Sequence, residues 1–371
     1  MGYRPTWAEI DLGALKFNFN SVRDKIKKGI RVMVVVKANA YGHGIVAVSR
    51  TLEREGVDYL GVATTDEALT LRSSGVKSPI LVLGAVLPEE APVAVRNDIT
   101  LTLCSDDLAK ALIREAKRLN KPAKVHIKID TGMGRIGVWH ESAPSFIENI
   151  FKTKELFPEG IYTHFSSAGR DDFFTQYQID SFDGLLKKMS QKNINFKLRH
   201  AANSIALISV LKSHLNLIRP GIIMYGIYPK KGASKLIRLK PVMSLKTRVT
   251  FLKDVPAGRS ISYGRTYITQ KDTKIATLPI GYADGYGRIL SNKAQAIVRG
   301  KRAPVIGKIT MDQTMLDVGH IQNVKTGDEV VLIGSQRGEL ITADELAKLC
   351  GTIPYEIVTG ISDRVPRVYK E

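Results

Sequence analysis

The feature that most constrains the fold is an alternation of short apolar segments with longer amphipathic ones over residues 11–228. The short segments have the length and branched residues of buried strands, and those between them have helical spacing, as in 106–119 and 173–189. The expected strand ends lie near Lys37, Ala63, Leu83, Leu103, Asp130, Phe165, His200 and Gly221. Because parallel strands need long crossovers, usually helices, this pattern predicts a (β/α)8 TIM-type barrel of the α/β class.

The residue pattern changes after a basic, glycine-containing connector at 230–235. From Lys240 onward, short β-rich runs alternate with turn residues, and one helix is expected near 343–349. A chain of 371 residues also exceeds what one compact core ordinarily holds. We therefore predict a barrel domain over residues 1–235, whose first few residues can pair with the second domain, and a mainly β domain over residues 236–371.

Composition narrows the class of protein. Apolar residues make up 44% of the chain and charged residues 25%, which is typical of a soluble globular protein. No segment has the continuous apolar length of a membrane span, so no membrane partner is expected. The two cysteines, Cys104 and Cys350, lie far apart and match no metal-binding spacing. This usage favours a cytoplasmic location and predicts no metal site.

The formal net charge of +19 is unusual for an enzyme of small metabolites. A nucleic-acid-binding protein would concentrate this charge in stripes interleaved with exposed aromatic residues. Here the basic residues are dispersed, with only short runs such as Lys27–Lys28 and Lys230–Lys231. Dispersed charge mainly confers solubility and attracts anions. We expect no nucleic-acid partner, and salt-sensitive DNA binding without enzymatic activity would support that alternative instead.

Lys37 closes a run of valines and precedes a polar, glycine-rich loop at 38–44. Because such a strand would be buried on both faces, Lys37 would lie where the strand leaves the core. Desolvation lowers the pKa of an amine and makes it nucleophilic toward carbonyls, as a Schiff-base lysine requires. A lysine at a strand end also commonly extends to water. This stretch alone therefore leaves both readings open.

Polar residues stand at the ends of several other predicted strands. With Lys37, the set comprises Lys128, Asp130, His164, His200 and Arg219. The C-terminal ends of the strands carry the chemistry in (β/α)8 barrels. Any one of these residues could be a structural polar group in the barrel mouth, but six at one rim predict a functional site.

The loops after the seventh and eighth predicted strands offer contacts for an anion. Gly221 and Ile222 present backbone N–H groups, and Asn203–Ser204 adds a hydroxyl at a helix start. Both loops also fit ordinary strand-to-helix connections. The segment 132–137 matches G-x-G-x-x-G, but it lies mid-chain and reaches Trp139 before any helix is expected. We therefore do not expect a dinucleotide site there.

These segments together resemble the alanine racemase family over nearly the whole chain. The matching segments are 4–11, 36–44, 128–137, 163–165, 200–204, 219–221, 262–264, 281–285, 311–312 and Tyr355. Because several long motifs occur in the expected order, the match is specific. The resemblance implies a pyridoxal-phosphate-dependent alanine racemase, an isomerase that interconverts L- and D-alanine and supplies D-alanine for peptidoglycan.

The resemblance also implies roles for individual residues. Lys37 would hold pyridoxal 5′-phosphate, and His164 would pack on its pyridine ring. Arg219, oriented by His200, would face the ring nitrogen. The remaining cofactor contacts that the resemblance implies are Tyr41, Asn203, Ser204, Gly221, Ile222 and Tyr355.

Members of the family form homodimers, which implies that Tyr263 and Met311 reach into the barrel of the partner chain. Arg135 would position Tyr263 and the substrate carboxylate. Lys128 matches a lysine that can be carbamylated in the family and then orients that arginine. Supporting positions implied in the second domain are Asp312 and Tyr282.

The chemistry of this set is coherent. Racemisation removes a proton from Cα on one face and returns a proton on the other, so two bases must flank one plane. Lys37 would serve one face and Tyr263 of the neighbouring chain the other. Arg219 hardly gives up its proton, its pKa being about 12 or higher. It would therefore leave the pyridine unprotonated and favour reprotonation in place over transamination.

Some positions depart from the family pattern. This chain has Lys308 and Thr310 where the family commonly has arginine and cysteine, and Gly169 where an acid is frequent. These positions belong to the substrate entrance, where the bulk of Tyr282 and Tyr355 favours a small substrate. One alternative is a racemase of serine or of a broader set of amino acids. Another is a non-catalytic pyridoxal-phosphate carrier, which would need no second base.

Overall fold

The computed structural model describes residues 4–371, which divide into two compact units. The barrel unit comprises residues 16–40 and 45–239. The β unit comprises the described residues up to Leu15 together with 41–44 and 240–371. The short segment 41–44 therefore belongs to the β unit, although it directly follows residues of the barrel unit along the chain.

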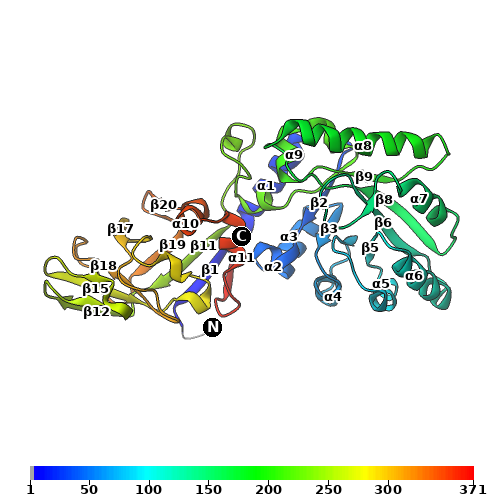
Figure 1. Ribbon diagram of the computed structural model, residues 1–371. Helices are drawn as coiled ribbons and strands as arrows, with labels where there is room; N and C mark the ends of the chain where they lie inside the picture. Colours follow the sequence, from blue (N-terminus) through cyan, green and yellow to red (C-terminus); the bar gives the residue numbers. More distant parts are fainter. Residues whose placement is uncertain (1–3) are drawn as a thin grey trace. The chain divides into compact units, whose positions relative to one another are not determined.

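The barrel unit is built on parallel strands in the order β10, β2, β3, β4, β5, β6, β8, β9 (Figure 1). Their bounds are β2 (Arg31–Val35), β3 (Tyr59–Val62), β4 (Ile80–Val82), β5 (Thr100–Leu103), β6 (Ala123–Asp130), β8 (Leu156–Tyr162), β9 (Leu198–His200) and β10 (Leu217–Ile218). The two-residue β7 (Val138–Trp139) pairs with β6. Backbone N–H groups of Asn216 and Arg219 donate to carbonyls of Arg199 and Ala202, so the two ends of the sheet also meet and the barrel nearly closes.

Most connections between these strands are helical, and Figure 1 shows α4 to α8 outside the strands. The helices are α1 (Leu12–Lys25), α3 (Ile45–Arg54), α4 (Thr65–Ser73), α5 (Ala91–Arg96), α6 (Asp106–Leu119), α7 (Ala143–Phe151), α8 (Asp172–Ser190) and α9 (Ser204–Ser209). Helix α6 shows why such segments form. The Ser105 hydroxyl accepts the N–H of Leu108 at its start, and Asn120 takes a left-handed conformation at its end.

The interior of the barrel contains a compact apolar cluster. Five strands contribute one side chain each to it, namely Met33, Tyr59, Leu81, Leu198 and Leu217. Such a layer arises because side chains alternate between the two faces of each strand and the inward ones meet inside the barrel. The barrel therefore contains a packed apolar layer.

The β unit has a large sheet in the order β17, β16, β19, β11, β1, β21, with β20 paired to β19. Its other sheets are β12-β15-β18 and β13-β14. The strands are β1 (Thr6–Asp11), β11 (Met243–Arg248), β12 (Phe251–Val255), β13 (Ser260–Ile261), β14 (Tyr267–Ile268), β15 (Thr273–Leu278), β16 (Gln295–Val298), β17 (Lys301–Pro304), β18 (Thr314–Asp317), β19 (Glu329–Gln336), β20 (Glu339–Ile341) and β21 (Arg367–Lys370). Strand β1 pairs with β11 and β21, which joins the two ends of the described chain.

The predicted fold class is confirmed, since a nearly closed parallel barrel precedes a mainly β region. Each predicted strand end lies within three residues of the observed one. The helix expected near 343–349 is α10 (Ala343–Cys350), and a second one, α11 (Pro354–Thr359), was not expected. Its six residues are too few to show helical periodicity. Within residues 4–371, no helix combines the length and apolar character needed to cross a membrane.

Candidate active site

The barrel unit places the predicted strand-end residues at the C-terminal ends of its strands. Lys128 and Asp130 are among the last three residues of β6, and His200 is the final residue of β9. Arg219 directly follows β10, while Lys37 and His164 each stand two residues beyond their strands. These side chains therefore share one rim of the barrel, where catalytic residues of this fold are found.

Lys37 is followed by a left-handed turn, labelled α2 (Lys37–Tyr41). The four residues 38–41 have φ angles between 52° and 54°. For residues with a Cβ, this conformation is unfavourable by roughly 1–2 kcal/mol each. Strained backbone of this kind persists only where its surroundings hold it, and it clusters at functional sites.

Glu67 holds this turn from the start of α4. Its carboxylate accepts the N–H of Ala38 at 2.6 Å and the N–H of Ala63 at 2.7 Å. It thereby joins the chain after β2 to the chain after β3. We did not predict this role, although Thr64 and Glu67 have the spacing of a capping box, and the Thr64 hydroxyl accepts the N–H of Glu67.

The surroundings of Lys37 favour its neutral amine. Its side chain keeps solvent-exposed surface. Partial desolvation nevertheless lowers the pKa of the Lys37 amine, nearby Arg135 lowers it further, and Glu67 opposes both effects. The neutral form of an amine is the nucleophile and the base, and a lowered pKa makes this form more accessible to Lys37 than to a free lysine.

Arg219 is buried, with 4% of its surface exposed. Its Nη1 donates to Nδ1 of His200 at 2.7 Å. Its Nη2 donates to the backbone carbonyls of Thr163 at 2.7 Å and Ala201 at 3.0 Å, and lies 3.3 Å from Nδ1 of His164. Burial lowers the pKa of Arg219 to about 10. The guanidinium therefore stays protonated at neutral pH, in a fixed orientation.

Tyr162 lies beside this guanidinium. Its ring stacks on His200, with centroids 4.6 Å apart and planes 5° from parallel. The cationic groups of Lys128 and Arg219 lie 5.4 Å and 5.2 Å from the centroid of the Tyr162 ring. Burial raises the pKa of Tyr162 to about 12, so the phenol is neutral. An aromatic residue inside a strand is usually core packing, and sequence analysis therefore missed it.

Lys128 is a buried amine. Desolvation lowers the pKa of Lys128 to about 7, and the charge of Arg219 contributes, while Asp130 opposes. Its Nζ donates to the carbonyl of Ile129 at 2.7 Å. At neutral pH a large fraction of this amine is therefore uncharged, which is the form that reacts with carbon dioxide.

Asp130 shapes the loop that carries Arg135. Its carboxylate accepts the successive N–H groups of Gly132–Gly134, with distances from 2.8 to 3.2 Å. The loop turns back here, and Arg135 follows as an exposed side chain. The next helix begins only at Ala143. The segment thus differs from a dinucleotide loop, which opens directly into a helix.

The two predicted anion-binding loops lie together in the barrel unit. The hydroxyl of Ser204 accepts the N–H of Gly221 at 2.8 Å. The side-chain oxygen of Asn203 caps α9 by accepting two backbone N–H groups of its first turn. Ile222 is buried and begins the short 3-10 helix η3 (Ile222–Tyr225). Sequence analysis named both loops, but not the bond between them.

In the β unit, Tyr41 and Tyr355 are neighbours, with ring centroids 6.0 Å apart. Burial raises the pKa of Tyr41 above its ordinary value and that of Tyr355 to about 12, so both hydroxyls remain donors. Arg367 donates to the carbonyl of Gly42 at 2.9 Å. A Cβ at Gly42 would lie 2.2 Å from the carbonyl oxygen of Val358, so this close approach requires glycine.

Three large side chains of the β unit are exposed on adjoining loops. They are Tyr263 (72% exposed), Met311 (53%) and Tyr282 (42%). The Ser262 hydroxyl donates to the carbonyl of Lys308 at 2.6 Å, and the N–H of Tyr282 donates to the carbonyl of Thr310 at 3.0 Å. Asp312 accepts a hydrogen bond from Arg364 at 2.7 Å. These contacts hold the exposed side chains on one ordered surface.

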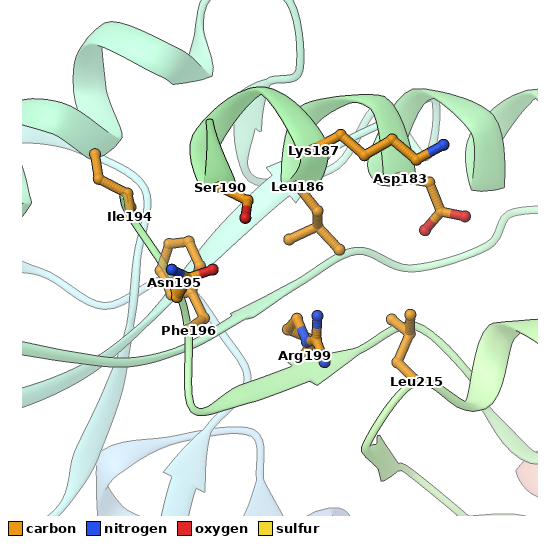
Figure 2. Close-up of a pocket in the computed structure, with 9 residues that line it drawn as sticks. All are labelled: Asp183, Leu186, Lys187, Ser190, Ile194, Asn195, Phe196, Arg199 and Leu215. Carbon is orange, nitrogen blue, oxygen red and sulfur yellow. The ribbon is translucent and has the colours of Figure 1, made fainter. Parts of the chain in front are cut away.

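A separate hollow lies on the outside of the barrel unit, between α8 and the segment that leads into β9 (Figure 2). Its volume is about 300 Å³, and its lining residues are Asp183, Leu186, Lys187, Ser190, Ile194, Asn195, Phe196, Arg199 and Leu215. None of the predicted site residues lines it. Among residues 4–371, no group of three or more His, Cys, Asp or Glu side chains is placed to hold a metal ion.

Comparison with known proteins identifies the family. The profile described as alanine racemase, N-terminal domain, matches residues 10–229, and that described as alanine racemase, C-terminal domain, matches residues 242–369. An alanine racemase of Halothermothrix orenii is 48% identical over 368 residues, covering 99% of this chain and 97% of that protein. One of Methanococcus maripaludis is 47% identical over 370 residues, covering 98% of each.

Solved structures of alanine racemases superpose closely on this chain. An alanine racemase of Clostridium difficile superposes with a TM-score of 0.94 at 39% identity, covering all of this chain and 97% of the other. One from Bacillus anthracis, with bound L-Ala-P, has a TM-score of 0.93 at 38% identity, covering all of this chain and 96% of the other. With profiles and relatives spanning nearly its whole length, the chain belongs to the alanine racemase family.

Proposed function

We propose that this racemase acts on alanine with pyridoxal 5′-phosphate bound at the mouth of the barrel unit. When bound, the cofactor supplies an electron sink for cleavage of the Cα–H bond. The observation that carries the proposal is the donor set around Arg219. A buried, protonated guanidinium, directed by an imidazole nitrogen and two carbonyls, fits an uncharged pyridine nitrogen as its acceptor.

Other residues of the barrel unit fit the rest of the cofactor. Lys37 offers an amine whose pKa is lowered toward the neutral form. Ser204 and the backbone N–H groups of Gly221 and Ile222 offer donors for a phosphate, since the Ser204 hydroxyl already lies 2.8 Å from the Gly221 nitrogen. The roles implied for Tyr41, Tyr355, Asn203 and His164 stay predictions.

The proton transfers require a base on each face of the substrate. The neutral Nζ of Lys37 would accept or return the Cα proton on one face. We assign the other face to the phenolic oxygen of Tyr263 of a second copy of the chain, with Met311 beside it. The exposure of Tyr263, 72% of its surface, supports this assignment, because a side chain so placed is available to a partner.

The protonated Arg219 would limit the electron withdrawal by the cofactor. A guanidinium whose pKa is about 10 remains a donor at neutral pH and leaves the ring nitrogen without a proton. Negative charge at Cα would then persist only briefly, and return of a proton would outrun transamination. Arg135 would position the substrate carboxylate, and carbamylated Lys128 would orient Arg135.

The biological setting follows from the same proposal. D-Alanine made here would serve peptidoglycan synthesis. Both cysteines are free thiols, which supports a cytoplasmic location. The bulk of Tyr282 and Tyr355 favours a substrate as small as alanine. Initial rates on a panel of amino acids would test this, and a larger kcat/KM for serine than for alanine would contradict it.

Mixing two inactive variants tests the shared site. In Lys37→Ala, loss of the amine should abolish both the yellow colour of the bound cofactor and the formation of D-alanine from L-alanine. Tyr263→Phe should keep the colour and lose activity. Lys25→Ala, at the exposed end of α1, serves as the control.

If the proposal is right, dimers that combine one Lys37→Ala chain with one Tyr263→Phe chain have one intact site, and an equal mixture regains about a quarter of wild-type activity. Failure to regain activity in verified mixed dimers would rule out the shared site.

A further inference from the structure

Arg219 is one end of a row of buried polar side chains that crosses the barrel unit. His200 accepts a hydrogen bond from Arg219 with its Nδ1. The other ring nitrogen of His200, Nε2, lies 2.8 Å from Nδ1 of His126. Nε2 of His126 in turn lies 3.9 Å from the carboxylate of Glu159. The row thus runs from the end of β10 through β9 and β6 to Glu159 on β8.

The protons along this row can be placed in only one consistent way. A guanidinium has no acceptor, so Nδ1 of His200 must be the unprotonated nitrogen of its ring. The proton of His200 therefore resides on Nε2 and is donated to Nδ1 of His126. The proton of His126 must then reside on its own Nε2, which faces Glu159. Each imidazole is neutral, and each donates in the direction away from Arg219.

The neutrality of both rings has a physical cause. Burial lowers the pKa of His200 well below its ordinary value, and the charge of Arg219 adds to this effect. Burial also lowers the pKa of His126, against the opposing influence of Glu159. A protonated ring at either position would set two N–H groups against each other, so the arrangement excludes that state.

Glu159 anchors the far end of the row. Its carboxylate accepts the hydroxyl of Tyr59 at 2.7 Å and the amine of Lys197 at 2.9 Å. Contact with His126 and these two donors holds the pKa of Glu159 well below its usual range, against the effect of burial. The group that ends the row is therefore a fixed anion, toward which the N–H of His126 points.

The backbone leaves room for this arrangement. A Cβ at Gly160 would lie 2.6 Å from the His126 ring, so only glycine lets the ring pack against β8 at this position. The rings of His126 and His200 are 5.0 Å apart between centroids. At 3.9 Å, the separation of His126 and Glu159 is roughly 1 Å longer than an N–H···O hydrogen bond, and it belongs to a charge-dipole contact.

We propose that Glu159 and His126 are positioning residues, which act through His200 to hold the Arg219 guanidinium as a directed donor. This rests on the proposed function for the part played by Arg219. Glu159 selects the tautomer of His126, His126 selects that of His200, and His200 presents a lone pair to Arg219. Arg219 favours these tautomers from one end of the row and Glu159 from the other. Loss of the anion would remove the second preference, so that a fraction of the His126 rings carries its proton on Nδ1, facing His200.

Nitrogen NMR on the protein without added cofactor tests the row independently of catalysis. The chain has seven histidines, so selective 15N-histidine labelling gives an assignable spectrum. We expect His126 and His200 of the unaltered protein to be neutral with the proton on Nε2. In Glu159→Gln, a measurable fraction of His126 should carry its proton on Nδ1. Glu115→Gln is the matched control, because Glu115 and Glu159 are each 8% exposed, and Glu115 pairs with Arg118 outside the row.

A second pair of variants tests the link to Arg219. His126→Asn can still accept from His200 with its oxygen and donate with its nitrogen, whereas His126→Leu can do neither. In the cofactor-loaded protein we expect His126→Leu to raise the ratio of transamination to racemisation by about tenfold, the scale of one lost hydrogen bond, and His126→Asn to restore it. Thermal unfolding checks that both variants are folded.

The outcomes separate the two proposals. If His126 and His200 of the unaltered protein carry their protons on Nδ1, the proposed arrangement of the row is wrong, whether or not the protein racemises alanine. Correct tautomers with an unchanged reaction ratio in folded His126→Leu would overturn the positioning role. If His126→Leu fails to fold, the ratio in Glu159→Gln decides the same question. Absence of racemisation in the unaltered protein would contradict the proposed function while leaving the NMR result intact.

Discussion

The left-handed turn after Lys37 predicts that removing one charge from Glu67 will loosen the backbone beside the reactive amine. In Glu67→Gln, one carboxylate oxygen becomes an amide NH2 group, which cannot accept a hydrogen bond. One of two bonds, to Ala38 at 2.6 Å or to Ala63 at 2.7 Å, is therefore lost. A hydrogen bond to a charged group contributes about 1.5–3 kcal/mol, and we take about 2 kcal/mol because Glu67 is only half-buried.

The loss of this hydrogen bond should appear first as local opening of the turn at residues 38–41. The four left-handed residues already store strain of roughly 1–2 kcal/mol each, so the turn opens before the barrel does. The N–H of Ala40, which donates to the carbonyl of Val36 at 2.8 Å, reports on it. We expect its hydrogen exchange to accelerate about 30-fold, since 1.4 kcal/mol corresponds to a factor of ten. The pKa of Lys37 should also fall further, because Glu67 raises it.

Glu90→Gln provides the control. Glu90 accepts the N–H of Leu87 at 3.0 Å and is half-buried like Glu67, so the same chemical change is made away from the turn. Exchange at Ala40 should then stay at the wild-type rate. If Glu67→Gln changes the exchange rate of Ala40 by less than about twofold, the turn is held by other contacts and the assignment of Glu67 is refuted.

Three further predictions concern the ionisable groups. In protein whose Lys128 is not carbamylated, the pKa of this amine, about 7 when folded against 10.5 when unfolded, means that the unfolded chain binds more protons between these values. The free energy of unfolding should therefore rise with pH across this window, by at most about 1.4 kcal/mol per unit, and urea unfolding of Lys128→Met should lack that rise. Arg219→Glu should increase the 2-oxo acid formed per alanine racemised, and an unchanged yield would refute the role given to Arg219. Tyr263→Phe should slow racemisation about 10²- to 10⁴-fold with unchanged unfolding, as measured by D-alanine formation and circular dichroism.

The sequence was sufficient for the barrel because its strands and helices repeat a strong local pattern. Helix α6, for example, begins and ends where its cap residues stand, at Ser105 and Asn120. The short helix α11 carries no such pattern, and its six residues depend on tertiary packing. Local periodicity therefore predicted long elements well and short ones poorly.

The candidate site divides in the same way. Lys37, His200 and Arg219 could be singled out because a polar residue at a strand end is conspicuous in a parallel barrel. Glu67, Tyr162 and His126 could not, since their roles depend on contacts between strands that are far apart in sequence. His126 did leave a trace, because it shares the inward face of β6 with Lys128 and Asp130 by alternation.

The polar row itself is an argument for function. A parallel barrel is ordinarily filled by apolar residues, as in the cluster around Met33 and Leu81. Burying His126, His200 and Arg219 instead removes polar and charged groups from water, which destabilises the fold unless every group is paired. Apolar residues of similar volume would serve folding at least as well. The row is therefore best explained by what it does for Arg219, the cationic end of the row at the barrel mouth, where a directed positive donor can meet a ligand.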